Sequence, residues 1–349
     1  MEVPPGVDIW TTPASKAPPG YTTDFNSTDT SAPVFYGVSS TFLALAVICV
    51  ALKLYIRILV HRKLGLDDAC SVIALLLQTS YTALVDFMFI RGGARHQWDM
   101  PLGLFLWIHQ IQTHLAVIQM LAYLFTKLAI LILYYRVFSP KPLFRWAILG
   151  GCAVVIPIYI AFFFIYIFGK TIQILVPTSY AVAIVNLITD VYLFLLPMFA
   201  IGSLNLPTVR KFGAAGIFAA GALACALSSL GVYYRFGTIA GIAAIDTTYT
   251  FSPRTAVLVV EIYIGIIVGC LPLFPGLLRK TVLTKFFAST YKSLRDRLNP
   301  STVSKSSSQS TYLDDSLPLS SYKKTQSVES HRDELERHYA DPEMQGRRS

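Results

Sequence analysis

The stretch "HRKLGLDDACSVIALLLQTSYTALV" (His61–Val85) decides the fold class, because it changes abruptly from charged to apolar side chains. Basic residues and the adjacent Asp67 and Asp68 come first, and an uncharged, largely apolar run follows from Ser71. A helix needs about 20 apolar residues to cross the hydrocarbon core of a bilayer. The sequence from Asp67 onward therefore predicts a membrane-spanning helix with a charged start.

The composition of the whole chain agrees with this interpretation. Of its 349 residues, 54% are hydrophobic and only 14% are charged, and the mean hydropathy is +0.54. A soluble domain has about 25% charged residues, so this chain lacks the polar material to cover a water-facing surface. The formal charge of +9 does not indicate nucleic-acid binding, because the basic residues lie in short loops and after the last apolar segment. The lipid bilayer is the expected partner.

Seven apolar segments predict an all-α, polytopic seven-transmembrane helix bundle over residues 34–278, preceded by an N-terminal tail over 1–33. Their expected ranges are 34–60, 67–90, 104–137, 146–168, 178–203, 211–237 and 254–278. After them, residues 279–298 predict a basic amphipathic helix on the inner leaflet. The Ser-rich polar sequence of 299–349 predicts a disordered cytoplasmic tail.

The distribution of Lys and Arg predicts the orientation. The first, third and fifth loops and the start of the C-terminal tail are basic, so the N-terminus is expected outside and the C-terminus in the cytoplasm. Asn26 begins an Asn-Ser-Thr tripeptide, a glycosylation acceptor pattern that fits an outside N-terminus. We expect a multi-pass protein of the plasma membrane or another membrane of the secretory pathway.

Several short motifs occur in order along these segments. They are Gly65-Leu66-Asp67-Asp68, Gly93 with His96 and Trp98, Lys127 with "LILYYRVF" (Leu131–Phe138), Asn186 with Asp190 and "LLP" (Leu195–Pro197), Arg210-Lys211, Arg235, Asp246, Glu261, and "GCLPLFPGLL" (Gly269–Leu278). In this order the chain resembles the fungal rhodopsin-domain integral membrane proteins, a family that includes the satratoxin-cluster membrane protein and Pth-type GPCR-like receptors.

The resemblance implies a rhodopsin-like, non-enzymatic and GPCR-like protein, associated with a secondary-metabolite gene cluster. Three features depart from the family pattern. Leu66 stands where a tryptophan is expected, and the loop between the fourth and fifth segments is the short "GKTIQILVPTS" without a cysteine. The chain also lacks the extracellular cysteine-rich module of the receptor subgroup.

Charged residues inside the spanning segments are the candidate functional residues, because burying charge in a membrane is costly. Counting from the expected helix ends places Lys127 and Asp190 near the midplane, so we expect them to form an ion pair. The pair could specify the fold, or it could form a ligand or proton site.

A second set of charged residues is expected nearer the outside. Arg235 and Glu261 could pair at the extracellular mouth with Asp246 above them, and together with His96 they could line a ligand pocket. His109 and His114 are five residues apart and do not share a helix face, so no metal site is predicted.

Asp67 and Asp68 are expected to cap the second helix at its cytoplasmic start, where carboxylates accept from unpaired N–H groups. Arg57, His61, Arg62 and Arg136 are candidate partners at the same boundary. Lys53 and Arg57 are expected in the inner part of the first helix, with side chains that extend toward the cytoplasm.

Three function classes remain open from the sequence. A receptor would bind a small-molecule ligand and a cytoplasmic signalling partner. A terpene-cyclase-like membrane enzyme would need convergent carboxylates, for which Asp67 and Asp68 are the obvious candidates. Their possible partners Asp86, Asp190 and Glu261 are expected at different depths, so no catalytic residue is predicted. A small-molecule transporter is the third class. Residues 254–278 contain no lysine that could form a Schiff base with retinal, and no cofactor is predicted.

Overall fold

The computed structural model describes residues 8–58, 64–138, 142–169, 171–202, 208–237 and 246–273. Seven long helices account for most of them: α1 (Ala32–Ile56), α2 (Leu66–Ile90), α3 (Leu102–Phe138), α4 (Pro142–Phe168), α5 (Ile172–Gly202), α6 (Thr208–Gly237) and α8 (Thr247–Val268). Two single turns of 3₁₀-helix, η2 (Gln97–Asp99) and η3 (Leu271–Leu273), complete the described secondary structure. The all-α prediction is therefore confirmed.

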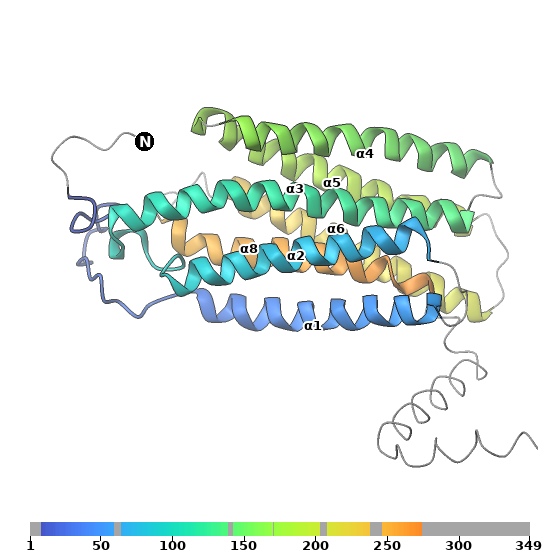
Figure 1. Cartoon of the computed structure of the whole chain (residues 1–349), viewed down its shortest axis with the longest axis horizontal. Coiled ribbons are helices and arrows are strands. Elements are labelled where there is room, and N and C mark those ends of the chain that lie inside the picture. The colour runs from blue at the N-terminus through green and yellow to red at the C-terminus, as the bar shows by residue number, and fades with distance from the viewer. Residues whose placement is uncertain are drawn as a thin grey trace, which may run out of the picture. The chain divides into compact units, whose positions relative to one another are not determined.

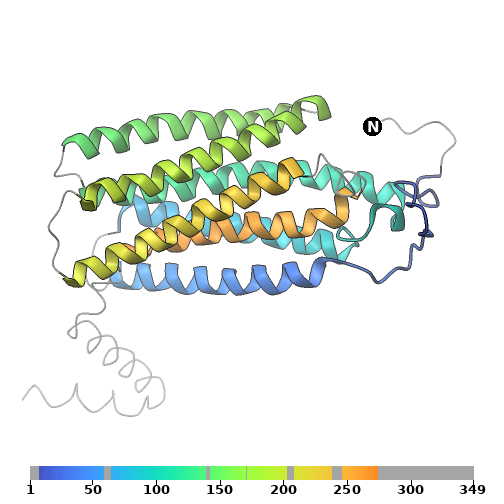
Figure 2. The same cartoon turned by 180° about the vertical axis from the view of Figure 1, so that it is seen from behind.

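The helices run lengthwise beside one another (Figure 1). α3 is central, packing against α2 and α4 and also contacting α5 and α8, and α1 packs against α2 and α8. From behind, α6 is seen beside its packing partners α5 and α8 (Figure 2). Because the helices alternate in direction, α1, α3, α5 and α8 all begin at one end, which we call the N-terminal end of the bundle.

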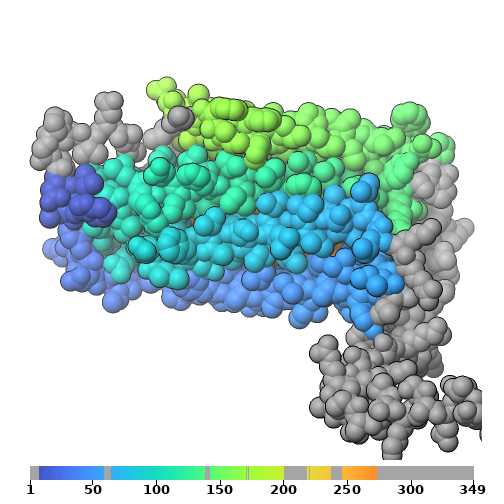
Figure 3. All heavy atoms as spheres, in the orientation of Figure 1, coloured from blue at the N-terminus to red at the C-terminus, as the bar shows by residue number. Residues whose placement is uncertain are grey.

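Six of these helices are long and apolar enough to cross a membrane: α1, α2, α3, α4, α5 and α8. Large apolar side chains cover their outward faces, including Ile48, Leu76 and Ile188, which are each about 60% exposed. The surface seen in Figure 3 is formed largely by α1 to α4. Apolar side chains outside and polar side chains inside are the arrangement that a lipid environment favours, so the chain is a multi-pass membrane protein.

The helix ranges differ most from the sequence prediction at α8. The expected segment began at residue 254, whereas α8 begins at Thr247, and Asp246 at its N-cap accepts a hydrogen bond from Tyr249 N at 3.4 Å. Hydropathy missed these first turns because they are rich in threonine. The described helix also ends at Val268, and the predicted segments 279–298 and 299–349 lie outside the described residues.

The residues that precede α1 pack on the N-terminal end of the bundle. Ala14 N donates to Met100 O at 3.0 Å, Leu102 N donates to Thr12 O at 2.9 Å, and Asp24 N donates to the side chain of Asp99 at 3.0 Å. The described part of the predicted N-terminal tail is therefore attached to the connection between α2 and α3.

Candidate functional site

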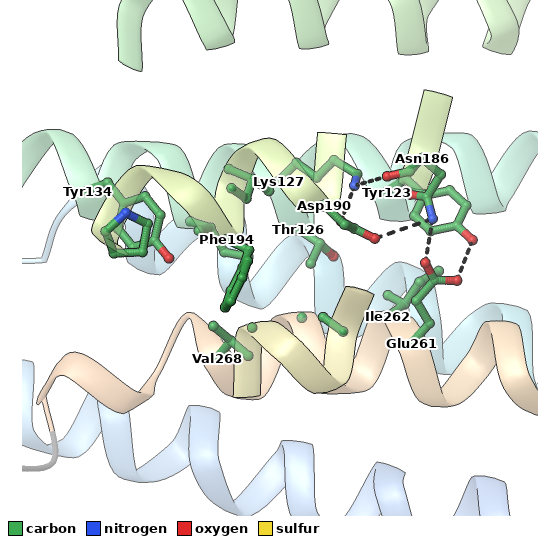
Figure 4. Close-up of a pocket in the computed structure, with 16 residues that line it drawn as sticks. Tyr123, Thr126, Lys127, Tyr134, Asn186, Asp190, Phe194, Glu261, Ile262 and Val268 are labelled. Atoms are coloured by element: carbon green, nitrogen blue, oxygen red, sulfur yellow. Dashed lines mark hydrogen bonds and ion pairs between the residues drawn. The ribbon is translucent and has the colours of Figure 1, made fainter. Parts of the chain in front are cut away.

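Lys127 on α3 and Asp190 on α5 form an ion pair inside the bundle. The Lys127 side chain is 3% exposed and that of Asp190 is 14% exposed. Lys127 Nζ also donates to the backbone oxygen of Asn186 at 3.4 Å. The two residues that the sequence placed at the same depth are thus in contact (Figure 4).

Glu261 on α8 belongs to the same cluster. Its carboxylate accepts a hydrogen bond from the Asn186 side-chain amide and another from the Tyr123 hydroxyl, the latter at 3.3 Å. The Ser228 hydroxyl on α6 lies within hydrogen-bonding distance of both the Asp190 and the Glu261 carboxylate. On the side of α4, the Tyr159 hydroxyl donates to Asn186 Oδ1 at 3.2 Å.

We call these residues the central network: Tyr123, Lys127, Tyr159, Asn186, Asp190, Ser228 and Glu261. They come from α3, α4, α5, α6 and α8, so a change in the network alters contacts of five helices at once. A cavity of about 40 Å³ adjoins the network and extends along α3 toward Tyr134. That volume has room for water beside the charged groups.

The central network contains one cation and two carboxyl groups. An unpaired negative charge in the interior of a membrane protein is costly, which favours a proton on one carboxyl. The Ser228 contacts favour the same state, because a single hydroxyl hydrogen cannot make a full hydrogen bond to two carboxylates at once. If one carboxyl is protonated, Ser228 can accept from it and donate to the other. The network is then neutral, with one proton held at Asp190 and Glu261.

A larger cavity of about 290 Å³, which we call the chamber, lies toward the N-terminal end of the bundle. Its lining combines apolar residues such as Phe105 and Leu175 with polar ones, among them Gln112, Gln119 and Arg235. The Gln119 amide donates to the Tyr123 hydroxyl at 3.4 Å, and Tyr123 in turn donates to Glu261. Hydrogen bonds therefore connect the chamber wall to the central network.

The four residues expected to line an outer pocket are divided between different places. Arg235 lines the chamber and donates to Ser179 O at 3.0 Å. Glu261 lies deeper, in the central network, and the described residues show no ion pair between it and Arg235. The reason is the early start of α8, which places Glu261 about four turns into the helix instead of two turns from its beginning.

His96 and Asp246 close the N-terminal end instead of lining the chamber. His96 Nδ1 lies 2.5 Å from Asp246 Oδ2, and the imidazole stacks between Trp98 and Tyr249 with ring centroids 4.5 and 4.2 Å away. Asp246 also accepts from Gln97 N at 3.1 Å. These contacts join the connection between α2 and α3 to the start of α8.

Asp67 and Asp68 lie at the opposite end, in a compact cluster of charges. Arg57 Nη2 is 2.6 Å from Asp67 Oδ2, and Lys53 Nζ is 3.4 Å from Asp68 Oδ1. Asp68 also accepts from Gly65 N at 2.9 Å at the start of α2. We call Lys53, Arg57, Asp67 and Asp68 the α1–α2 clasp.

The clasp corrects the expectation that Lys53 and Arg57 extend toward the aqueous boundary, because their side chains are only 0% and 2% exposed. Two cations facing two carboxylates balance the buried charge, which water would otherwise have to solvate. Arg136 adds a contact to Asp67 at 3.5 Å, whereas His61 and Arg62 lie outside the described residues.

Sequence reasoning did not single out Tyr123, Tyr159 and Ser228 of the central network, or Arg254 on α8, which lines the chamber. Tyr123 is four residues before Lys127, a spacing that puts both on one helix face and could have indicated a link. Ser228 lies among small residues of α6 and gives no such signal. Asn26 is exposed, as a glycosylation site requires, and no group of three or more metal-ligating side chains occurs among the described residues.

The chain is similar to known proteins over most of its length. The family model of the fungal rhodopsin domain matches residues 52–280. The chain is also 24% identical over 339 residues to Fugralins biosynthesis cluster protein 2 of Gibberella zeae, an alignment that covers 89% of this chain and 82% of that protein. No solved structure matches the chain.

Proposed function

Since the chain belongs to the fungal rhodopsin domain family, we propose that it is a non-enzymatic, GPCR-like membrane receptor for a small molecule. The observation that carries this proposal is the hydrogen-bonded path from the chamber to the central network through Gln119, Tyr123 and Glu261. A ligand that displaces Gln119 changes the partners of Tyr123, and hence those of Glu261. Because five helices contribute to the network, their relative positions respond.

The charge distribution of the loops supports a chamber that opens outside and a cytoplasmic signalling partner at the opposite end. The plasma membrane or another secretory-pathway membrane is the proposed location, with a glycan on Asn26. The relative from Gibberella zeae is named as a biosynthesis cluster protein. We extend this association to the present chain and propose a role beside a secondary-metabolite pathway.

A transporter is the second candidate, and the carboxyl pair favours it. A proton held at Asp190 and Glu261 is the element that a proton-coupled transporter would use, with the chamber as its substrate site. The receptor remains the first candidate because no repeat of the kind that many transporters are built from is visible in the sequence.

Deletion of the gene separates the two candidates when both the transcriptional response to culture extract and the intracellular metabolites are measured. A receptor predicts a loss of transcriptional response to added culture extract, restored by the wild-type gene and not by a Gln119→Ala/Tyr123→Phe variant that reaches the membrane normally. A transporter predicts intracellular accumulation of one metabolite instead. A normal response to the extract in the deletion strain contradicts the receptor.

A further inference from the structure

Two arginines line the chamber and have few partners. Arg235 on α6 is 5% exposed and donates through Nη1 to Ser179 O at 3.0 Å. Arg254 on α8 donates through Nη2 to the Ser179 hydroxyl at 3.4 Å. The Nε atoms of both are buried and have no hydrogen-bond partner. A guanidinium carries five N–H donors, so most of the donor capacity of this pair is unused by the described residues.

No acidic residue within the described ranges forms an ion pair with either arginine. The connection between α6 and α8, residues 238–245, supplies none either, because its sequence "TIAGIAAI" contains no aspartate or glutamate. Both guanidinium groups donate to Ser179, so they are close enough to repel each other. Tyr81, Tyr166 and Tyr180 are close enough to offset part of the positive charge of Arg254.

Elsewhere in the bundle, the buried cations Lys53, Arg57 and Lys127 each have a carboxylate partner. Lys53 and Arg57 face the carboxylates of Asp67 and Asp68, and Lys127 faces that of Asp190. A buried charge without a partner is strongly destabilising. Two adjacent cations at a cavity wall, without an acidic partner among the described residues, therefore indicate that the compensating charge comes from a bound molecule.

The other residues that line the chamber indicate the chemistry of the remainder of that molecule. Phe105, Leu175 and Phe251 supply apolar surface, and His109 and Gln112 add polar groups that can orient a ligand. A cavity of about 290 Å³ holds a small organic molecule. Apolar walls with two cations at one side fit an amphipathic anion better than a sugar or an inorganic ion.

We propose that the chamber binds an organic anion with an apolar body, whose carboxylate or phosphate is held by the guanidinium groups of Arg235 and Arg254. Arginine suits this role because its planar fork donates two parallel hydrogen bonds to such a group. This inference specifies the ligand class of the proposed receptor and in that sense rests on it. The anionic group could belong to a free metabolite or to a lipid that enters from the bilayer.

The test uses the full-length protein in nanodiscs of phosphatidylcholine, with phenylbutyrate as the free anion and its amide as the neutral control. We expect phenylbutyrate to raise the Tm and the amide to leave it unchanged. Arg235→Gln and Arg254→Gln should each weaken phenylbutyrate binding by about 10- to 100-fold, as expected for the loss of a charged hydrogen bond. Arg91→Gln, which removes an exposed arginine outside the chamber, should bind phenylbutyrate as the wild type does.

A parallel series replaces part of the phosphatidylcholine by phosphatidic acid without added phenylbutyrate. A rise in Tm confined to this series, and lost in the same two variants, assigns the site to a lipid headgroup. A rise with phenylbutyrate in neutral nanodiscs assigns it to a free anion. Equal effects of acid and amide, or no effect of either anion on the wild type, overturn the proposal.

Stability without ligand supplies a second measurement. If the two arginines form an anion-binding site, Arg254→Gln removes a charge that is uncompensated in the ligand-free protein, and the ligand-free Tm should stay the same or rise. A purely structural pair predicts a lower ligand-free Tm with phenylbutyrate binding unchanged, which also overturns the proposal. If the protein binds the anion but the transcriptional response is absent, the receptor proposal is refuted and the anion site is not. If the cells respond to a neutral compound and Arg235→Gln leaves that response intact, the anion site is refuted and the receptor proposal is not.

Discussion

The Tyr123 hydroxyl on α3 donates a hydrogen bond to Glu261 on α8 at 3.3 Å, at a point between the chamber and the ion pair of the central network. The same hydroxyl accepts from the Gln119 amide at 3.4 Å. One oxygen atom thus touches both parts of the candidate site. Occupancy of the chamber and the state of the network can influence each other through it, and by linkage the influence is reciprocal.

Replacing Tyr123 by Phe tests this link. The ring stays and the hydroxyl is lost, so Glu261 loses one donor and the unfolding free energy should fall by about 1–2 kcal/mol. Binding of phenylbutyrate to the chamber should change little, while its effect on hydrogen exchange of α8 around Glu261 should disappear. Persistence of that effect in the variant would show that Tyr123 does not transmit it.

The ion pair of the central network should respond unequally to loss of its two members. Lys127→Met leaves two carboxyl groups without a cation and should cost about 3–5 kcal/mol of stability. Asp190→Asn leaves Lys127 with Glu261, so the charges still balance and the cost should be smaller. Thermal unfolding of both variants and of the double variant in nanodiscs gives the comparison. Ser228→Ala serves as a control that removes a hydrogen-bonding group without changing the charge. Equal losses in the two charge variants would contradict the charge balance described here.

The sequence predicted the number and order of the helices because a membrane requires long apolar segments, which composition reveals directly. It also predicted that Lys127 and Asp190 lie at the same depth in the membrane, since depth follows from counting residues along straight helices. The count failed for Glu261 because the true start of α8, at Asp246 and Thr247, is polar and was assigned to a loop.

Arg254 shows the same limit of sequence reasoning. It was the first charged residue of the expected last segment and gave no sign of facing a cavity, because a cavity is made by side chains of several helices. Lys53 and Arg57 were expected to extend toward the cytoplasm for a related reason: only the packing of α1 on α2 reveals that Asp67 and Asp68 lie opposite them.

The α1–α2 clasp should be needed for folding. Asp67→Asn/Asp68→Asn removes both carboxylates from two buried cations, so we expect retention in the endoplasmic reticulum and a fall in surface expression of about 10-fold or more. The tail contains a second Leu-Asp-Asp tripeptide at residues 313–315, and Asp314→Asn/Asp315→Asn is the matched control. Surface labelling of both double variants gives the readout, and equal surface expression of the two would exclude a structural role of the clasp.

The bond between His96 and Asp246 should hold the start of α8 in place. His96→Phe keeps a ring between Trp98 and Tyr249 but removes the 2.5 Å contact to the Asp246 carboxylate. We expect a loss of stability of about 1–3 kcal/mol, as for other hydrogen bonds to a charged group. Asp246→Ala removes the N-cap as well and should therefore cost more. Hydrogen–deuterium exchange over residues 246–253 measures the effect directly: both variants should exchange faster there than the wild type, with α4 as the internal reference. Unchanged exchange in His96→Phe would mean that stacking and the N-cap alone hold the helix start.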